Sequence, residues 1–340
     1  MTSYLAKRLL LMLITLGIIC FTGYAMMRLA PGSPARSNIF GAETSGMAMT
    51  EGKELVRNKN LESKLHLDKS IMTGFYAWIK DILTGRGLGE SAIVEPGRDV
   101  WEVLKPRLQV TLSLNIPALI ITWIIAIPLG MTMTVHEGSW GEEVGKLMLF
   151  LLYSLPGMWV ALMLQALFCD GGVWELFPLR GLESGDTGRM NTFRAAWKYI
   201  RAWFLPVIAL SYSSIAVLSI YIKSGMGEIM RQDYIRTARA KGVQNEDLFW
   251  KHGFRNELIP LLTLASGMLP GLAAGSVMVE YVFGIPGMGS LALTALSSRD
   301  YPLQMGIFVL TGVLTLAGIM ITDILYTWAD PRISFDSKNH

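Results

Sequence analysis

Charged residues are scarce in this sequence, and they are unevenly placed. Asp, Glu, Lys and Arg make up only 17% of the 340 residues, whereas hydrophobic residues make up 51%. The charges gather between long apolar runs, which excludes an ordinary soluble globular protein. Such a pattern is typical of a polytopic membrane protein.

The apolar runs contain almost no ionisable side chains. An ion-coupled carrier usually places ionisable groups near the bilayer midplane, because a proton or cation needs local ligands within hydrocarbon. Here the exceptions, Glu280 and Asp323, lie towards the ends of their runs, where capping or interfacial placement explains them. The sequence therefore disfavours a secondary carrier that works alone, which remains the alternative class of transporter.

Residues that could support catalysis or hold a metal are also few. The histidines, at positions 66, 136, 252 and 340, are too scattered to form a zinc peptidase site. The nearest approach to a phosphate-binding loop, GEEVGKL, has the wrong glycine spacing and a leucine at the magnesium-binding position. The two cysteines, Cys20 and Cys169, indicate no disulfide framework. We therefore predict no catalytic residue, no metal site and no cofactor in this chain.

Six apolar runs are long enough to cross a bilayer as helices, which takes about 20 residues each. They are Leu9 to Met27, Val110 to Met133, Leu147 to Phe168, Phe204 to Ile222, Leu261 to Phe283 and Met305 to Trp328. The predicted fold class is an all-α integral membrane protein with six transmembrane helices.

The distribution of Lys and Arg predicts the orientation. With the N-terminus inside, cytoplasmic segments carry about twelve of these residues and the short outer loops about six, so both termini are predicted to be cytoplasmic. The first run is too long for the apolar core of a signal peptide and lacks a convincing cleavage site, so we predict an uncleaved anchor. The predicted parts are the tail and first helix (1–29), an extracytoplasmic segment (30–106), a five-helix core (107–335) and a C-terminal tail (336–340).

Prolines and glycines predict where the spans bend and pack. Proline removes a backbone donor from a helix, so kinks are expected within the runs at Pro117, Pro128, Pro156 and Pro270. Three glycines at four-residue spacing would share one face of the fifth helix and permit close approach of a partner: Gly267, Gly271 and Gly275.

A basic segment, RTARAKGVQNEDLFWKHGFRNELIP, separates the fourth and fifth runs. We predict a helix from Tyr234 to Lys241, a left-handed stop at Gly242, and a second helix capped by Asn245 with Glu246 and Asp247 in its first turn. The segment is therefore predicted to form a helical hairpin.

The second helix of this hairpin has two faces. Four-residue spacing places Trp250, Phe254 and Leu258 in an apolar stripe, beside a cationic stripe of Lys251 and Arg255. Two interpretations stay open from these residues alone. The hairpin could dock into a partner protein, or it could lie on anionic lipid headgroups.

The hairpin also resembles the cytoplasmic loop of permease subunits of ATP-binding-cassette importers, in the oligopeptide, dipeptide and nickel group. The resemblance rests on YIRTARAKG followed by WKHGFRNELIP, and it extends to RLAPGSP, GRGLGES, LKPRLQVTLSLNIPALI, EYVFGIPGMGSLALTALSSRDYP and DILYTWADPRI. The general loop begins Glu-Ala-Ala, whereas this chain has Arg236, Thr237 and Ala238, and Pro260 lies about five residues later than usual. LFPLRGL and TARAKGV resemble the branch that includes the microcin C and oligopeptide permeases.

The resemblance implies a type I importer permease with a coupling loop at 223–260. It implies a homologous second permease, two cytoplasmic ATPases acting through 232–260, and an extracytoplasmic binding protein in a bacterial inner membrane. ATP and Mg²⁺ would bind to the ATPases. Peptides lead as substrates, with nickel, glutathione or another small solute as alternatives. The implied coupling residues are Arg236, Thr237, Ala238, Ala240 and Gly242, with Trp250, Arg255, Asn256 and Pro260 in support.

Overall fold

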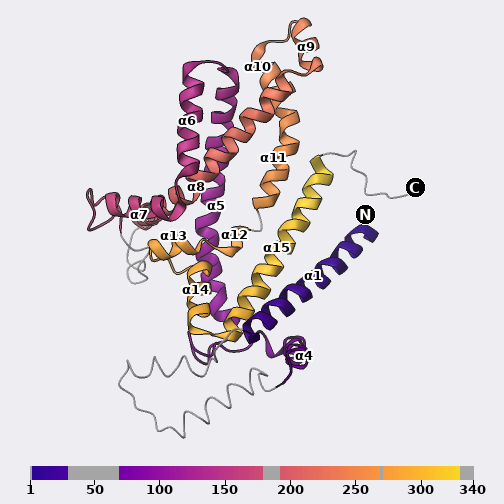
Figure 1. Ribbon diagram of the computed structural model, residues 1–340, viewed down its shortest axis with the longest axis vertical. Helices are drawn as coiled ribbons and strands as arrows, with labels where there is room; N and C mark the ends of the chain where they lie inside the picture. Colours follow the sequence, from indigo (N-terminus) through magenta and orange to yellow (C-terminus); the bar gives the residue numbers. More distant parts are fainter. Residues whose placement is uncertain (1, 30–68, 179–191, 269–270, 330–340) are drawn as a thin grey trace. The chain divides into compact units, whose positions relative to one another are not determined.

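The computed structural model describes residues 2–29, 69–178, 192–268 and 271–329 (Figure 1). Regular structure in these ranges is helical apart from two isolated β-bridges, Glu90 with Asp99 and Cys169 with Phe177. The chain divides into two compact units, Met1–Val110 with Pro286–Ala317, and Thr111–Ile285 with Gly318–His340.

Four described helices are long and apolar enough to cross a membrane. They are α1 (Thr2–Leu29), α5 (Val100–Val135), α8 (Thr192–Met230) and α15 (Tyr301–Ala329). A fifth span is possible where α6 (Trp140–Ser154) and α7 (Gly157–Phe168) pass the same test together, although they are bent by 95°. The all-helical membrane class is therefore confirmed, and the count of six spans stays a prediction.

The prolines act differently in different spans. Leu155 and Pro156 are both extended, with ψ of 129° and 131°, so α6 ends and α7 begins anew. This break is expected because proline disfavours helical geometry at the residue before it. Helix α5, in contrast, continues through Pro117 and Pro128 without interruption. Pro270 lies outside the described residues.

Three helices are described in the region of the expected fifth span. They are α11 (Arg255–Met268), α12 (Gly271–Ala274) and α13 (Val277–Val282). The prediction that Gly267, Gly271 and Gly275 share one helix face is wrong for Gly275, which lies between α12 and α13. Gly275 has φ of +77°, which interrupts helical geometry, and a Cβ added at Gly267 or Gly271 would meet no atom of the described residues within 4 Å.

Close helix approach occurs instead between α5 and α8. A Cβ added at Gly130 would lie 2.7 Å from the carbonyl oxygen of Ser219 and 2.8 Å from Cβ of Ile222. The first of these neighbours is backbone, so the helices would have to separate to admit any side chain. Gly130 therefore permits the close helix packing that the glycine spacing predicts for Gly267, Gly271 and Gly275.

Glu280 and Asp323, the acidic residues of the apolar runs, lie within helices. Glu280 is fully buried in the first turn of α13 and accepts a hydrogen bond of 3.0 Å from the Thr111 hydroxyl. A carboxylate in a first turn also interacts favourably with the helix dipole. Asp323 is half-buried in α15.

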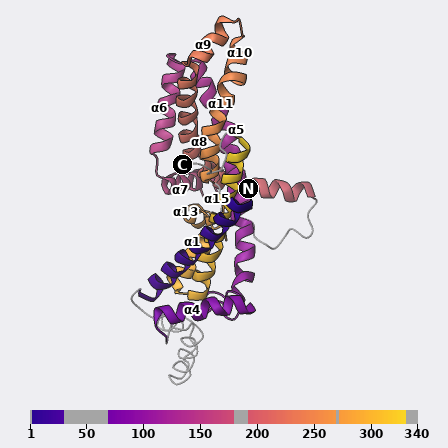
Figure 2. The same ribbon diagram turned by 90° about the vertical axis from the view of Figure 1, so that its right-hand side faces the viewer.

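The second unit is organised around α8. Helices α6 and α7 pack against α8, and α13 packs against α7 (Figures 1 and 2). Helix α6 begins after Ser139, whose hydroxyl accepts from the backbone N–H of Glu142, and its first turn carries Glu142 and Glu143. Acidic residues at this end favour the helix by offsetting its dipole.

The first unit comprises α1, α4 (Ile71–Asp81), the π-helical turn η1 (Ile82–Arg86), α14 (Met288–Ser298) and the parts of α5 and α15 within it. Its larger apolar core joins the start of α5 to α14 and α15, through residues that include Leu104, Leu291 and Leu303. Phe75 of α4 packs against Phe21 and Tyr24 of α1.

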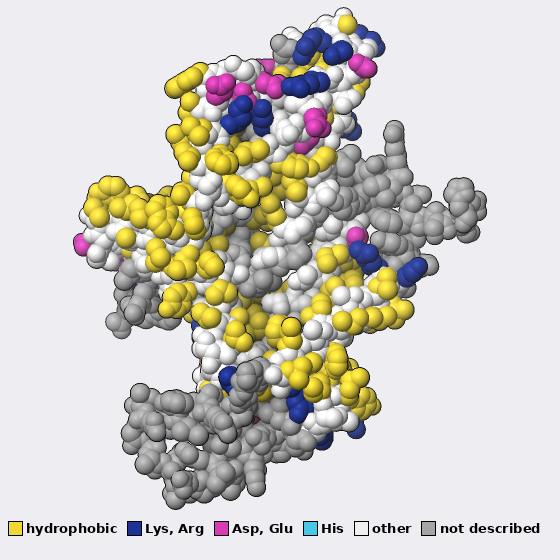
Figure 3. All heavy atoms as spheres, in the orientation of Figure 1, with side chains coloured by type: hydrophobic (Ala, Val, Ile, Leu, Met, Phe, Trp, Pro, Cys, Tyr) yellow, Lys and Arg dark blue, Asp and Glu magenta, His cyan; other side chains and the backbone are white. Residues whose placement is uncertain are grey.

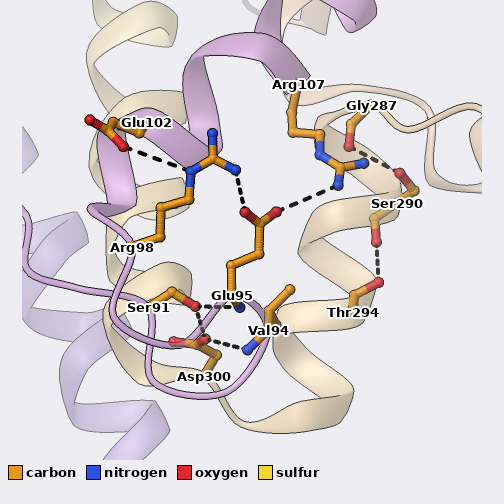
Figure 4. A network of polar contacts seen from close by, with 10 residues as sticks. All are labelled: Ser91, Val94, Glu95, Arg98, Glu102, Arg107, Gly287, Ser290, Thr294 and Asp300. Carbon is orange, nitrogen blue, oxygen red and sulfur yellow. Dashed lines mark hydrogen bonds and ion pairs between the residues drawn. The ribbon is translucent and has the colours of Figure 1, made fainter. Parts of the chain in front are cut away.

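A buried carboxylate, Asp300, organises the turn before α15 (Figure 4). It accepts hydrogen bonds from the Ser91 hydroxyl at 2.6 Å and from the backbone N–H groups of Ile93 and Val94 at 2.9 and 3.0 Å. It also caps α15 by accepting from the N–H of Leu303 at 3.3 Å. Asp300 therefore fixes the loop at 91–94 to the α14–α15 corner.

Candidate functional site

The first arm of the basic hairpin is a short helix that ends at a defined turn. Helix α9 (Asp233–Ala240) follows α8 after a break at Arg231 and Gln232. Gly242 has φ of +82°, its N–H donates to the Arg239 carbonyl at 3.0 Å, and the Val243 N–H donates to the Ala238 carbonyl at 3.3 Å. These two bonds define a Schellman motif, which needs a left-handed residue. The predicted stop at Gly242 is confirmed.

The second arm is a continuous helical run with an unusual centre. It consists of α10 (Asn245–Asp247), the π-helical stretch η3 (Leu248–Phe254) and α11. The run begins at Asn245 itself, and Glu246 and Asp247 lie in its first turn as predicted. A π-helix bonds over five residues instead of four, so it rotates the side chains that follow relative to an α-helix.

This rotation alters which face of the second arm is buried. In the predicted apolar stripe, Trp250 remains 54% exposed and Leu258 38% exposed. The buried residues are instead Leu248 and Gly253, five positions apart, followed by Glu257. Two of the three residues of the predicted stripe are therefore exposed, and the residues that the second arm buries are different ones.

The two arms are joined to one another and to α8. The Asn256 side-chain amide donates to the Tyr234 hydroxyl at 2.8 Å, which links α11 to α9. Met226 and Ile222 of α8 share an apolar cluster with Leu261 of α11. The hairpin is thus held by both of its stems, α8 and α11.

The outer surface of the hairpin is strongly cationic. Figure 3 shows Lys and Arg side chains gathered over α9 and α10. Six exposed cations contribute: Arg231, Arg236, Arg239, Lys241, Lys251 and Arg255. Two of them have acidic partners within the hairpin, since Arg236 lies 3.6 Å from Asp233 and Lys251 lies 2.9 Å from Asp247, and a third, Arg231, contacts Glu137 at 3.0 Å. Such exposed pairs contribute little stability and leave the surface open to a partner.

The nine residues named from the resemblance all lie within the hairpin. In the first arm Arg236, Thr237 and Ala240 are exposed and Ala238 is half-buried, and Gly242 is exposed at the turn. In the second arm Trp250, Arg255 and Asn256 are exposed, and Pro260 is half-buried within α11. The exposed members form an outer surface rather than an enclosed cavity.

An ion-pair cluster beside the hairpin was missed by sequence reasoning. Glu142 of α6 is buried and contacts Lys223 of α8 at 2.8 Å and Lys146 at 3.0 Å. Arg231, at the end of α8, contacts Glu137 at 3.0 Å. The i,i+4 spacing of Glu142 and Lys146 within GEEVGKL could have indicated the ion pair between these two residues. These contacts tie the α5–α6 connection to α8.

A second missed residue, Glu257, lies between the hairpin stems. Its side chain is 1% exposed, and its Oε1 atom has no hydrogen-bond partner among the described residues. Glu257 precedes the expected fifth span, which begins at Leu261. Burial raises the pKa of the Glu257 carboxyl to about 7, with a smaller contribution from the neighbouring Glu228.

We expect Glu257→Gln to reduce the pH dependence of stability. The pKa of Glu257 rises from 4.5 to about 7 on folding, so the folded state holds the proton more tightly than the unfolded state. Stability should then fall as pH rises through this window, by roughly 3 kcal/mol. Glutamine has no proton to release and should remove most of that fall. Thermal unfolding of the purified wild type and of Glu257→Gln in detergent, at about pH 5 and about pH 8, checks this. Equal pH dependence of stability in the two proteins would contradict it.

Comparison with known proteins identifies the family. The model for "Binding-protein-dependent transport system inner membrane component" matches residues 126–335, which include the whole hairpin. The chain is 30% identical to the dipeptide transport system permease protein DppB of Alkalihalophilus pseudofirmus, over 98% of this chain and 100% of the relative. It is also 30% identical to the oligopeptide transport system permease protein AppB of Bacillus subtilis, with the same coverage. YejB, an inner membrane ABC transporter permease protein of Escherichia coli O157:H7, is 28% identical over 99% and 100% of the two chains.

A solved structure has the same fold. A chain from inward-facing structures of the MetNI methionine ABC transporter aligns with a TM-score of 0.51 and 16% identity, covering 67% of this chain and 97% of that one. With the family match, this places the protein among membrane-spanning transport permeases. The chain belongs to the family of binding-protein-dependent transport system inner membrane components. The resemblance drawn from the hairpin motifs is confirmed, and the family is one of transporters rather than enzymes.

Proposed function

We propose that this permease forms, with a second homologous permease, the translocation pathway of an importer for peptides or peptide-like substrates. Two cytoplasmic ATPases drive the importer through the hairpin at 232–260, and an extracytoplasmic binding protein delivers substrate. Both termini are cytoplasmic, and the membrane is the bacterial inner membrane. ATP and Mg²⁺ bind to the ATPases and not to this chain.

The hairpin geometry is the observation that carries this proposal. Its tip is cationic and exposed, and its turn is held by the Schellman motif at Gly242. Its two stems, α8 and α11, are helices of the second unit. A force applied to such a tip would be transmitted to the helices that carry it, because packed helices move as stiff elements. This is the property that an ATPase-driven permease requires.

Affinity purification from native membranes tests the proposed partners. A tagged chain should retain a second permease and ATP-binding subunits in mild detergent, and Arg236→Glu with Arg255→Glu should release the ATP-binding subunits. Arg194→Glu is the matched control, because Arg194 is also exposed but lies outside the hairpin. Recovery of the chain alone, with uptake that needs no ATP, would overturn the proposal and favour a lipid-binding role for the hairpin.

The proposed substrate class rests on the relatives, several of which are named as dipeptide, oligopeptide or peptide permeases. Uptake of isotope-labelled peptides and of nickel should be compared in a strain that lacks this chain and in the same strain complemented with it. Restored peptide uptake alone supports the proposal. Restored nickel uptake without peptide uptake would replace peptides with the metal ion as cargo.

A further inference from the structure

The two stems of the hairpin meet at a contact between a buried carboxyl group and a glycine. A Cβ added at Gly225 of α8 would lie 2.3 Å from Oε1 and 2.5 Å from Oε2 of Glu257. These distances mean that the Glu257 carboxyl occupies the space where any other residue at position 225 would place its side chain. Gly225 therefore provides the space in α8 that receives the end of Glu257.

This contact lies at the centre of the buried row of the second stem. Gly253, Glu257 and Leu261 follow at four-residue spacing and are all buried. A Cβ added at Gly253 would lie 2.8 Å from Cε of Met226, and Leu261 shares an apolar cluster with Met226. The row thus packs along α8 on either side of the Glu257 contact.

A carboxyl group is a costly choice at such a position. Burying a polar group without a hydrogen bond destabilises a protein, and Oε1 of Glu257 has none among the described residues. A leucine or methionine would fill the space without that cost. An unsatisfied buried polar group in a native structure calls for an explanation, and a functional role is one of them.

Resting on the proposed function, we propose that Glu257 is a positioning residue whose contact with Gly225 makes α8 follow the second stem when ATPases displace the hairpin. The apolar neighbours can slide past one another, whereas a side chain that extends into the space above a glycine blocks such sliding. Loss of the contact should uncouple movement of the hairpin from movement of α8, so ATP would be hydrolysed with less substrate transported.

The test measures substrate imported per ATP hydrolysed by the complete complex in proteoliposomes. Gly225→Ala places a methyl group where the carboxyl lies and should lower this ratio about fivefold. Glu257→Asp shortens the side chain by one methylene group and should also lower the ratio. The double variant exchanges one methyl for one methylene group, and its ratio should recover towards that of the wild type.

Gly227→Ala is the matched control, because it makes the same change two residues along α8, where a Cβ meets no atom within 4 Å in the part of the chain that the structure describes. It should leave the ratio unchanged. A purely structural role would lower the yield of complex but leave the ratio unaltered in what assembles. If the complex with Gly225→Ala does not assemble, the ratio measured for Glu257→Asp alone tests the proposal, since that substitution removes atoms and adds no clash.

The two possible failures can be told apart. Wild-type ratios in Gly225→Ala and in Glu257→Asp, within a complex that transports normally, would overturn only the role of this contact. The role of this contact would also be overturned if the double variant lost as much of the transport ratio as its two single variants together. A wild-type complex that imports without ATPases would overturn the proposed function, and this inference with it.

Discussion

Gly242→Val is expected to abolish substrate uptake while the partner ATPases continue to bind and to hydrolyse ATP. Gly242 has φ of +82°, and a Cβ there would meet no atom of the described residues within 4 Å, so the expected effect comes from the backbone rather than from a clash. A left-handed conformation costs a residue with a side chain about 1–2 kcal/mol, and a β-branched residue more. The Schellman turn would open, and the tip would no longer transmit force to both stems.

Asparagine supplies the matched comparison at this position. It adopts left-handed geometry more readily than other residues with side chains, so Gly242→Asn should retain most of the uptake. Uptake and ATP hydrolysis measured in the same proteoliposomes separate coupling from assembly. Normal uptake by Gly242→Val would refute the requirement for this turn.

Asp300→Ala should produce the largest loss of stability. Five donors use this buried carboxylate: the Ser91 hydroxyl and the N–H groups of Ala92, Ile93, Val94 and Leu303. Hydrogen bonds to a charged group contribute about 1.5–3 kcal/mol each, and these donors lose their acceptor together. We expect a loss of at least about 4 kcal/mol, allowing for non-additivity.

Asp99→Ala provides the control for this loss in the same unit. Asp99 also caps a helix, because it precedes α5 and accepts from the N–H of Trp101 at 2.7 Å. Its removal should cost only about 1 kcal/mol, as is usual for one N-cap. Thermal unfolding in detergent measures both, with limited proteolysis of the loop at 91–95 as a local readout. Similar losses in the two variants would contradict the special role of Asp300.

Local features of the hairpin could be predicted from the sequence because they depend on neighbouring residues. Gly242 is a left-handed stop since only glycine adopts that geometry cheaply, and Glu246 and Asp247 lie in a first turn since helix dipoles favour them there. The packing face of the second arm could not be predicted in this way. The π-helical stretch Leu248–Phe254 shifts the register, so its buried residues, Leu248 and Gly253, are five positions apart rather than four.

The glycines show the same contrast between local patterns, which the sequence predicts, and packing, which it does not. Gly267, Gly271 and Gly275 have a suggestive pattern, but Gly275 has φ of +77° and lies between two helices. Gly130 and Gly225 have no such pattern, yet each is matched to an atom brought close by another helix, the Ser219 carbonyl oxygen and the Glu257 carboxyl. A close approach between helices depends on the residues of both helices, whereas a spacing pattern in the sequence describes only one of them.

The sequence by itself determined that this protein is helical and membrane-spanning, because apolar runs of bilayer length allow only helices in hydrocarbon. It also determined the hairpin and its turn, since glycine, caps and charges act within a few residues. Only the tertiary structure decided which residues meet: Asp300 with the loop at 91–94, Glu142 with Lys223, and Glu257 with Gly225. The physical reason is that these contacts join residues 32 to more than 200 positions apart, and their energies depend on burial and geometry that no local pattern records.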